Sequence, residues 1–201
     1  MSACESAFPP AALDALTDAL HPDPFYAALT PEANASDAWR KILRAYFAYA
    51  LDEARQYGIV ELVRETNAGA AIWLLPQADG VAEKLQQTKN AALEKILAPR
   101  GFENYRAIIA AMALRTERVA PPNAWYLSIL GIAPPLQNQS LGAKLVAVTL
   151  AQADAQHAPC YLETFNPRTL SFYERAGFRI VARHAEKITR ADYWIMTRAA
   201  R

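Results

Sequence analysis

LGIAPPLQNQSLGAKL, residues 130–145, is the stretch of sequence that decides the fold. It joins a predicted strand at 125–132 to a predicted helix at about 141–157. Small side chains at positions 140, 142 and 143 would let an anion approach the N–H groups that point out of a helix start, where the helix dipole favours negative charge. The stretch therefore predicts a cradle for a diphosphate, with an ordinary polar turn as the alternative.

The first half of the chain is expected to be mostly helical. Apolar residues near the helical period predict four helices, which lie between Pro10 and His21, at 36–56, at 81–97 and at 102–117. Ser36 is the expected N-cap of the second helix, and Gly101 is expected to end the third.

Strands are expected in a hairpin and throughout the second half. Runs at 59–63 and 70–75 are separated by Asn67 and Gly69, which suit a tight reversal and predict the hairpin. Further strands are predicted at 125–132, 161–165, 178–188 and 192–198, with a helix at 168–176 that ends at Gly177. The segment MSACESAF at 1–8 is short and not β-branched, so it predicts no clear first strand.

The composition argues against several classes of function. The 201 residues include 21 Lys and Arg and 20 Asp and Glu, and the net charge of +1 gives no electrostatic reason to bind nucleic acid or an acidic membrane. With 53% hydrophobic residues, the chain can bury the core of one compact domain. Cys4 and Cys160 predict neither a disulfide framework nor a zinc site, and no metal is expected. A start without a signal peptide and the lack of a long apolar run predict a cytoplasmic protein.

The stretch at 130–145 resembles motif A of the GCN5-related N-acetyltransferases (GNAT), usually written Q/R-x-x-G-x-G/A. Gln137 stands at the Gln/Arg position, Ser140 replaces the first Gly and Gly142 matches the second. LETFNPRTLSFYERAGF, residues 162–178, resembles motif B of the family, with Asn166 and Tyr173 in the expected places. The runs WYLSILGI, YLET and FYERAGF are most similar to the puromycin N-acetyltransferases and their bacterial relatives within that family.

This resemblance implies an α/β fold in a single domain, 1–201. Its mixed, twisted sheet would have six or seven strands flanked by helices, with the strands near 125–132 and 160–166 splayed apart. Residues 121–201 would bind acetyl-coenzyme A, and residues 1–120 would supply the acceptor side.

The resemblance also implies three groups of cofactor contacts. Backbone groups at Leu130, Gly131 and Ile132 would pair with the pantetheine arm, which Asn166 would also touch. Tyr173 would contact the cofactor at its sulfur. The diphosphate would lie on the loop and helix start formed by Gln137, Asn138, Gln139, Ser140, Leu141, Gly142 and Ala143.

Amine acetylation needs a neutral amine, a stabilised oxyanion and a protonated thiolate leaving group. Glu163 is the candidate base, and strand alternation places it with Tyr161 and Phe165, either facing a cleft or near an exposed edge. Tyr173 matches the family's general acid, with core packing as the alternative. Asn166 stands before a proline and can equally be a helix cap.

We therefore expect an acetyl-coenzyme A-dependent N-acetyltransferase that acts on a primary amine of a small molecule. It would work without a metal, as a monomer or homodimer, and without a nucleic-acid or membrane partner. Two alternatives stay open: an acyl-coenzyme A-binding module that carries out no chemistry, and an N-acetyltransferase for the termini of proteins or peptides.

Overall fold

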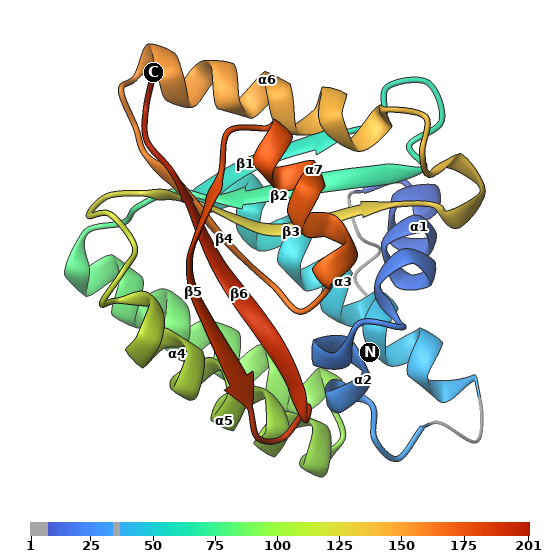
Figure 1. Cartoon of the computed structure of the whole chain (residues 1–201). Coiled ribbons are helices and arrows are strands. Elements are labelled where there is room, and N and C mark those ends of the chain that lie inside the picture. Colours follow the sequence, from blue (N-terminus) through green and yellow to red (C-terminus); the bar gives the residue numbers. More distant parts are fainter. Residues whose placement is uncertain (1–7, 34–36) are drawn as a thin grey trace.

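The computed structural model describes residues 8–33 and 37–201 (Figure 1). In chain order the elements are α1 (Pro10–Leu20), α2 (Pro24–Leu29), α3 (Ala38–Tyr57), β1 (Gly58–Leu62), β2 (Gly69–Leu74), α4 (Asp79–Ile96), α5 (Pro99–Thr116), β3 (Trp125–Ile132), η1 (Pro134–Leu136), α6 (Leu141–Ala155), β4 (Cys160–Thr164), η2 (Pro167–Thr169), α7 (Leu170–Arg175), β5 (Arg179–Glu186) and β6 (Ala191–Arg198). The expected hairpin, strands and helices are confirmed to within a few residues. The expected cap Ser36 and the question of a first strand at 1–7 lie outside the described residues.

The described strands form one mixed sheet in the order β1-β2-β3-β4-β6-β5. β3 and β4 are parallel, and the other neighbouring pairs are antiparallel. The parallel pairing ends at Leu127 opposite Leu162, whereas β3 continues to Ile132. The two central strands therefore splay apart, which confirms the six-stranded, splayed mixed sheet among the expected folds.

A bulge in β3 changes the face to which its side chains point. The register with β2 skips Ser128, so this residue is an extra one in the strand. Before the bulge, Trp125 and Leu127 pack in the cluster beneath α6 and α7, whereas Ile129 after it packs with α1 and α3 on the other face. The bulge thus places residues from both sides of Ser128 around one space on the α1–α5 face.

Helices cover both faces of the sheet (Figure 1). The larger cluster joins α1 and α3 to β2 and β3, with Leu16, Leu43 and Phe47 fully buried. α6 and α7 cover the opposite face. α5 adds Ile108 and Met112 to a third cluster, which packs against β6 and the end of β4. None of the helices in the described ranges is long and apolar enough to cross a membrane.

Gly101 does not end a helix, contrary to the expectation from sequence. α4 ends at Ile96, Leu97 takes an extended conformation, and Pro99 starts α5 with Gly101 in its first turn. A Cβ at Gly101 would overlap the backbone carbonyl oxygen of Leu29 at the end of α2. The glycine therefore permits close packing between α2 and α5.

We predict that Gly101→Ala destabilises the protein, whereas Gly80→Ala does not. The methyl group at position 101 must displace backbone of α2, which costs about 1–3 kcal/mol for overpacking. A Cβ at Gly80, in the first turn of α4, meets nothing within 4 Å. Urea unfolding monitored by circular dichroism measures both variants, and equal stability of the two would contradict this account of Gly101.

Candidate active site

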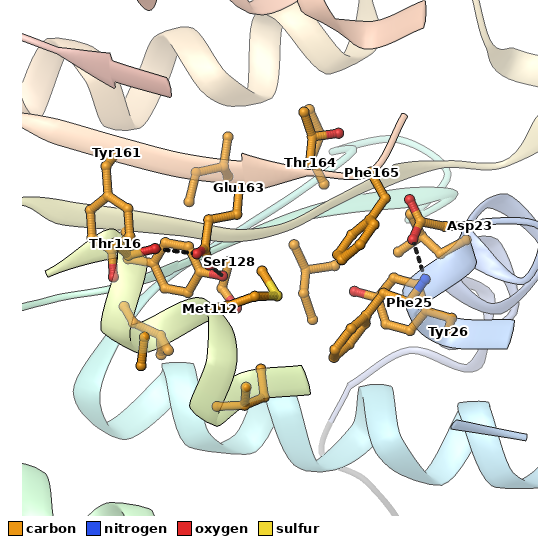
Figure 2. Close-up of a pocket in the computed structure, with 18 of the residues that line it drawn as sticks. Asp23, Phe25, Tyr26, Met112, Thr116, Ser128, Tyr161, Glu163, Thr164 and Phe165 are labelled. Atoms are coloured by element: carbon orange, nitrogen blue, oxygen red, sulfur yellow. Dashed lines mark hydrogen bonds between the residues drawn. The ribbon is translucent and has the colours of Figure 1, made fainter. Parts of the chain in front are cut away.

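A cavity of about 350 Å³ lies where β3 and β4 separate, and residues of α2, α5 and α7 line it. Figure 2 shows a close-up of its lining residues. Eight aromatic side chains line it: Phe25, Tyr26, Tyr46, Tyr105, Tyr126, Tyr161, Phe165 and Tyr173. Its charged lining residues are Asp23, Lys89 and Glu163. A second hollow of about 360 Å³ shares five lining residues with it: Leu74, Gln86, Lys89, Tyr126 and Tyr161. The site is thus an aromatic chamber with a few charged groups in its walls.

Glu163 faces this cavity, which decides between the two positions left open by the sequence. The side chain accepts a hydrogen bond from the Thr116 hydroxyl on α5 and another, at 3.1 Å, from the Tyr126 hydroxyl on β3 (Figure 2). Burial raises the pKa of the Glu163 carboxyl, and the two hydrogen bonds oppose that shift. Two hydroxyls from different elements therefore hold a carboxylate with a raised pKa in the cavity wall.

Tyr126 is brought to the site by the parallel pairing of the central strands. It lies opposite Tyr161 in the β3–β4 register, and the two rings stack with centroids 4.5 Å apart and planes 11° apart. Burial raises the pKa of Tyr126, and the nearby Glu163 charge raises it further, so the hydroxyl stays a donor. The preceding residue, Trp125, is buried beneath α6 on the opposite face and does not line the cavity.

Tyr173 both packs against core residues and lines the cavity, which the sequence analysis treated as alternatives. Its ring packs edge-on against Phe172 and Phe178, with centroids 5.1 and 6.1 Å away, and only 8% of the residue is exposed. It also lines the cavity. Burial, followed by the negative charge of Asp23, raises the pKa of the Tyr173 phenol, which keeps its proton at neutral pH.

Asp23 is a cavity residue that sequence reasoning missed. It caps α2, since its Oδ1 accepts the Phe25 N–H at 2.9 Å (Figure 2). Burial raises the pKa of Asp23 to about 6, against the effect of that hydrogen bond. Asp before Pro24 does indicate a helix start. Nothing local in the sequence indicates that this cap faces a chamber built by β3, β4 and α7.

β3 offers a backbone edge beside the cavity. Its pairing with β4 ends at Leu127, so the following residues have no partner strand on that side within the described part of the chain. An edge of this kind can accept an extended chain as an added strand. Leu130 lines the cavity, and Ile132 ends the strand next to the loop that leads to α6. Gly131 allows α1 to pack closely on the strand, because a Cβ at this position would come within 2.8 Å of the Leu16 side chain on α1.

The loop 137–140 bends tightly and is exposed. The Gln137 side-chain amide donates a hydrogen bond to the Ile132 carbonyl oxygen at 3.0 Å, which connects the loop to the end of β3. The Gln139 side-chain amide donates a hydrogen bond to the Pro135 carbonyl oxygen at 3.4 Å. Asn138 and Ser140 have φ values of 62° and 59°. Ser140 thus adopts a left-handed conformation at the position where motif A most often has Gly.

The start of α6 presents small residues and backbone donors. Ser140 is its N-cap but makes no side-chain capping hydrogen bond. The N–H groups of Leu141, Gly142 and Ala143 have no acceptor within the helix. A Cβ at Gly142 would make an ordinary 3.6 Å contact with Phe172, away from solvent, whereas Ala143 is exposed. This helix start fits an anionic group.

Asn166 is a cap in the structure. Its Oδ1 accepts the Arg168 N–H at 3.0 Å at the start of η2, and its own N–H donates to the Thr164 hydroxyl at 3.2 Å. Asn166 is therefore a helix cap, the alternative considered from sequence, and it lies just beyond the end of β4. In the ranges 8–33 and 37–201, no group of three or more His, Cys, Asp or Glu side chains is placed to hold a metal ion.

Solved structures share this architecture. The chain is similar to the histone acetyltransferase HPA2 and related acetyltransferase from Corynebacterium glutamicum, with a TM-score of 0.64, 20% identity and coverage of 100% of this chain and 95% of that one. Arylalkylamine N-acetyltransferase 2 from Aedes aegypti gives a TM-score of 0.65 at 12% identity, covering 94% and 93%. Naa20 from Chaetomium thermophilum, solved with a bisubstrate analogue, gives 0.52 at 16% identity, covering 96% and 84%. At these identities, the likeness shows the fold.

A family model matches the sequence itself. The model for the acetyltransferase (GNAT) family covers residues 77–178, just over half of the chain, and this range contains β3, the loop into α6, β4 and α7. The chain therefore belongs to the acetyltransferase (GNAT) family and is an acetyl-coenzyme A-dependent N-acetyltransferase.

Proposed function

We propose that this enzyme acetylates the primary amine of a small molecule held in the aromatic cavity. One observation carries the proposal: a carboxylate, Glu163, and a protonated phenol, Tyr173, line the same chamber at the point where β3 leaves β4. These are the two proton-transfer groups that amine acetylation requires.

The residues of the second half fit acetyl-coenzyme A. The free edge of β3 at Leu130 and Ile132 would pair with the pantetheine arm, and Asn166, just past the end of β4, would touch the same arm. The N–H groups at the start of α6, behind the exposed loop 137–140, would hold the diphosphate. When bound, acetyl-coenzyme A supplies an activated acetyl thioester. On this assignment, residues 121–201 bind the acetyl donor and residues 1–120 close the acceptor side.

Glu163 acts as the base in this proposal. An alkylamine is mostly protonated at neutral pH and must lose a proton before its nitrogen can form the new C–N bond. A carboxylate whose pKa is raised by burial takes that proton more readily than an exposed one, and Thr116 and Tyr126 hold it in position. Backbone N–H groups near Ile129 to Gly131 would stabilise the oxyanion.

Tyr173 acts as the acid. As the C–S bond breaks, the departing sulfur gains negative charge and takes a proton from the phenol. The high pKa of Tyr173 keeps that proton available at neutral pH. Starting from the ammonium form, the acceptor nitrogen thus loses two protons: Glu163 takes the first and releases it to solvent, and the second leaves as the amide forms and replaces the proton that Tyr173 gives to the sulfur. The acetyl group moves from sulfur to nitrogen.

The dimensions of the cavity favour a small acceptor. About 350 Å³ is within the range of small-molecule sites, and residues of α2 and α5 line the space. The likeness of WYLSILGI, YLET and FYERAGF to puromycin N-acetyltransferases points to the same class of acceptor.

The proposal is tested by following thiol release with acetyl-coenzyme A and a panel of small amines and peptides. Coenzyme binding without thiol release, or release with peptides alone, would contradict it.

We predict that Ala143→Glu weakens coenzyme A binding about tenfold or more, because the added charge lies beside the diphosphate, with one such repulsion costing roughly 1.4 kcal/mol. Glu is favourable in the first turn of a helix, so the fold should be retained. Ala143→Gln adds nearly the same bulk without charge and is the matched control. Calorimetric titration measures the affinity of both variants for coenzyme A. Equal affinities would contradict binding of the diphosphate at this helix start.

We predict that Tyr173→Phe lowers turnover by roughly 10²- to 10⁴-fold, the usual contribution of a positioned proton donor, while coenzyme A affinity changes little. The phenyl ring keeps the packing against Phe172 and Phe178. Tyr49→Phe removes a hydroxyl on α3 outside the cavity and is the control for loss of a phenol. Steady-state kinetics with a rate-limiting chemical step provide the readout. Near-normal turnover in a stable Tyr173→Phe variant would leave Tyr173 with a packing role only.

We predict that Glu163→Gln lowers kcat/KM by roughly 10²-fold or more and removes the acid limb of its pH profile. A base works when deprotonated, so wild-type kcat/KM should fall as the pH drops through the raised pKa of Glu163, above the ordinary Glu value of about 4.3. Glu117→Gln changes an exposed carboxylate after α5 and serves as the control. An unchanged acid limb in Glu163→Gln would assign that limb to another group.

A further inference from the structure

Two acidic residues and one basic residue line the cavity. Asp23, the N-cap of α2, and Glu163 on β4 both line it, and Figure 2 shows Asp23 at the right of the view and Glu163 left of its centre. Lys89 is the charged lining residue of opposite sign. Its ammonium group is 2.7 Å from Glu53, and both side chains are mostly buried, at 16% and 9% exposure. Because Lys89 is already paired, it does not neutralise either carboxylate.

The two carboxylates differ in what holds them. Glu163 accepts hydrogen bonds from two side-chain hydroxyls, those of Thr116 and Tyr126. Asp23 accepts one bond from a backbone N–H, at Oδ1, because it caps α2. No bond to its second oxygen, Oδ2, occurs among the hydrogen bonds of the described residues, and this carboxylate can receive a donor from a ligand.

Aromatic rings fill the distance between the two acids. Phe165 follows Glu163 by two residues along the strand direction, roughly 7 Å further on. Its ring stacks on Phe25 with centroids 6.3 Å apart, and Phe25 is two residues from Asp23. Tyr26 packs against Phe25 at 5.1 Å. A ligand that reaches from one acid to the other therefore passes along apolar ring faces and edges, which suit both hydrocarbon and cations.

We propose that Asp23 binds a second cationic group of the acceptor, so that the preferred substrates are amines carrying another positive charge across an apolar spacer. This inference rests on the proposed function, since it takes the reacting amine to lie on the Glu163 side. A monoamine would leave one partly buried carboxylate without a partner, whereas a dication pairs with both. The raised pKa of Asp23, about 6, leaves the carboxyl mostly charged at about pH 8, the pH chosen for the test.

The test compares matched acceptors. Linear α,ω-diamines from diaminopropane to diaminooctane are assayed for thiol release beside monoamines of the same chain length. We expect kcat/KM to favour the diamine by about 10- to 100-fold at the best length, as for one hydrogen-bonded charge pair. The preference should lie mainly in KM, because the second cation would pair with Asp23, which takes no part in the proposed proton transfers, and would bind equally in the ground state and the transition state.

Asp23→Asn is the informative variant, because Asn caps a helix as well as Asp and retains the acceptor for the Phe25 N–H. We expect it to abolish the diamine preference, with a rise in KM for the diamine that the monoamine does not show. Glu32→Gln changes an exposed carboxylate just after α2 and is the matched control. Thermal unfolding of each variant accompanies the kinetics.

Three outcomes would overturn the proposal. Equal kcat/KM for diamines and monoamines in the wild-type enzyme would show that no second cation is bound. A diamine preference that survives Asp23→Asn would place the second cation elsewhere. An equal loss of kcat for both acceptors in Asp23→Asn would make Asp23 part of proton transfer, acting beside Tyr173. Absence of thiol release with every amine would instead contradict the proposed function itself.

Discussion

The early end of the β3–β4 pairing, at Leu127 opposite Leu162, is the constraint on which the site depends. Parallel strands that stay paired would use their own backbone groups and leave no room between them. Because this pair stops after three residues, β3 keeps a free edge towards Ile132, and the space beside it becomes the cavity. The bulge at Ser128 then turns residues on both sides of it into that space. The same break in the sheet thus makes the proposed cofactor edge and the proposed acceptor chamber.

The first half of the chain completes the chamber by covering it. α2 brings Asp23 and α5 brings Thr116, and the two helices pack closely because Gly101 has no side chain against Leu29. Glu163 consequently receives one hydroxyl from β3 and one from α5. The position of the proposed base therefore depends on contacts between segments that are far apart in sequence.

The elements could be predicted because their signals are local. Gly177 ends α7 with φ of +95°, as its position after a short helical run indicates, and Asn67 turns the first hairpin with a positive φ. The expectation for Gly101 is wrong because a glycine after a helical run usually terminates a helix, whereas here its role is contact with another helix. Motif likeness locates the loop at 137–143 but gives no sign of Asp23. The local pattern of Asp23 is satisfied by capping α2, and only the tertiary structure places it in the cavity.

Burial raises the pKa of every acidic group in the chamber, but the consequence differs between the carboxylates and the phenol. Burial among aromatic rings disfavours every charged form, so it raises the pKa of Glu163 and Asp23 and also that of Tyr173. For a carboxylate this moves the pKa toward neutrality and strengthens it as a proton acceptor. For a phenol it moves the pKa further from neutrality and preserves it as a proton donor. Burial in this chamber thus makes Glu163 a stronger proton acceptor and keeps Tyr173 protonated. A cationic acceptor would offset the cost of holding the carboxylates out of water.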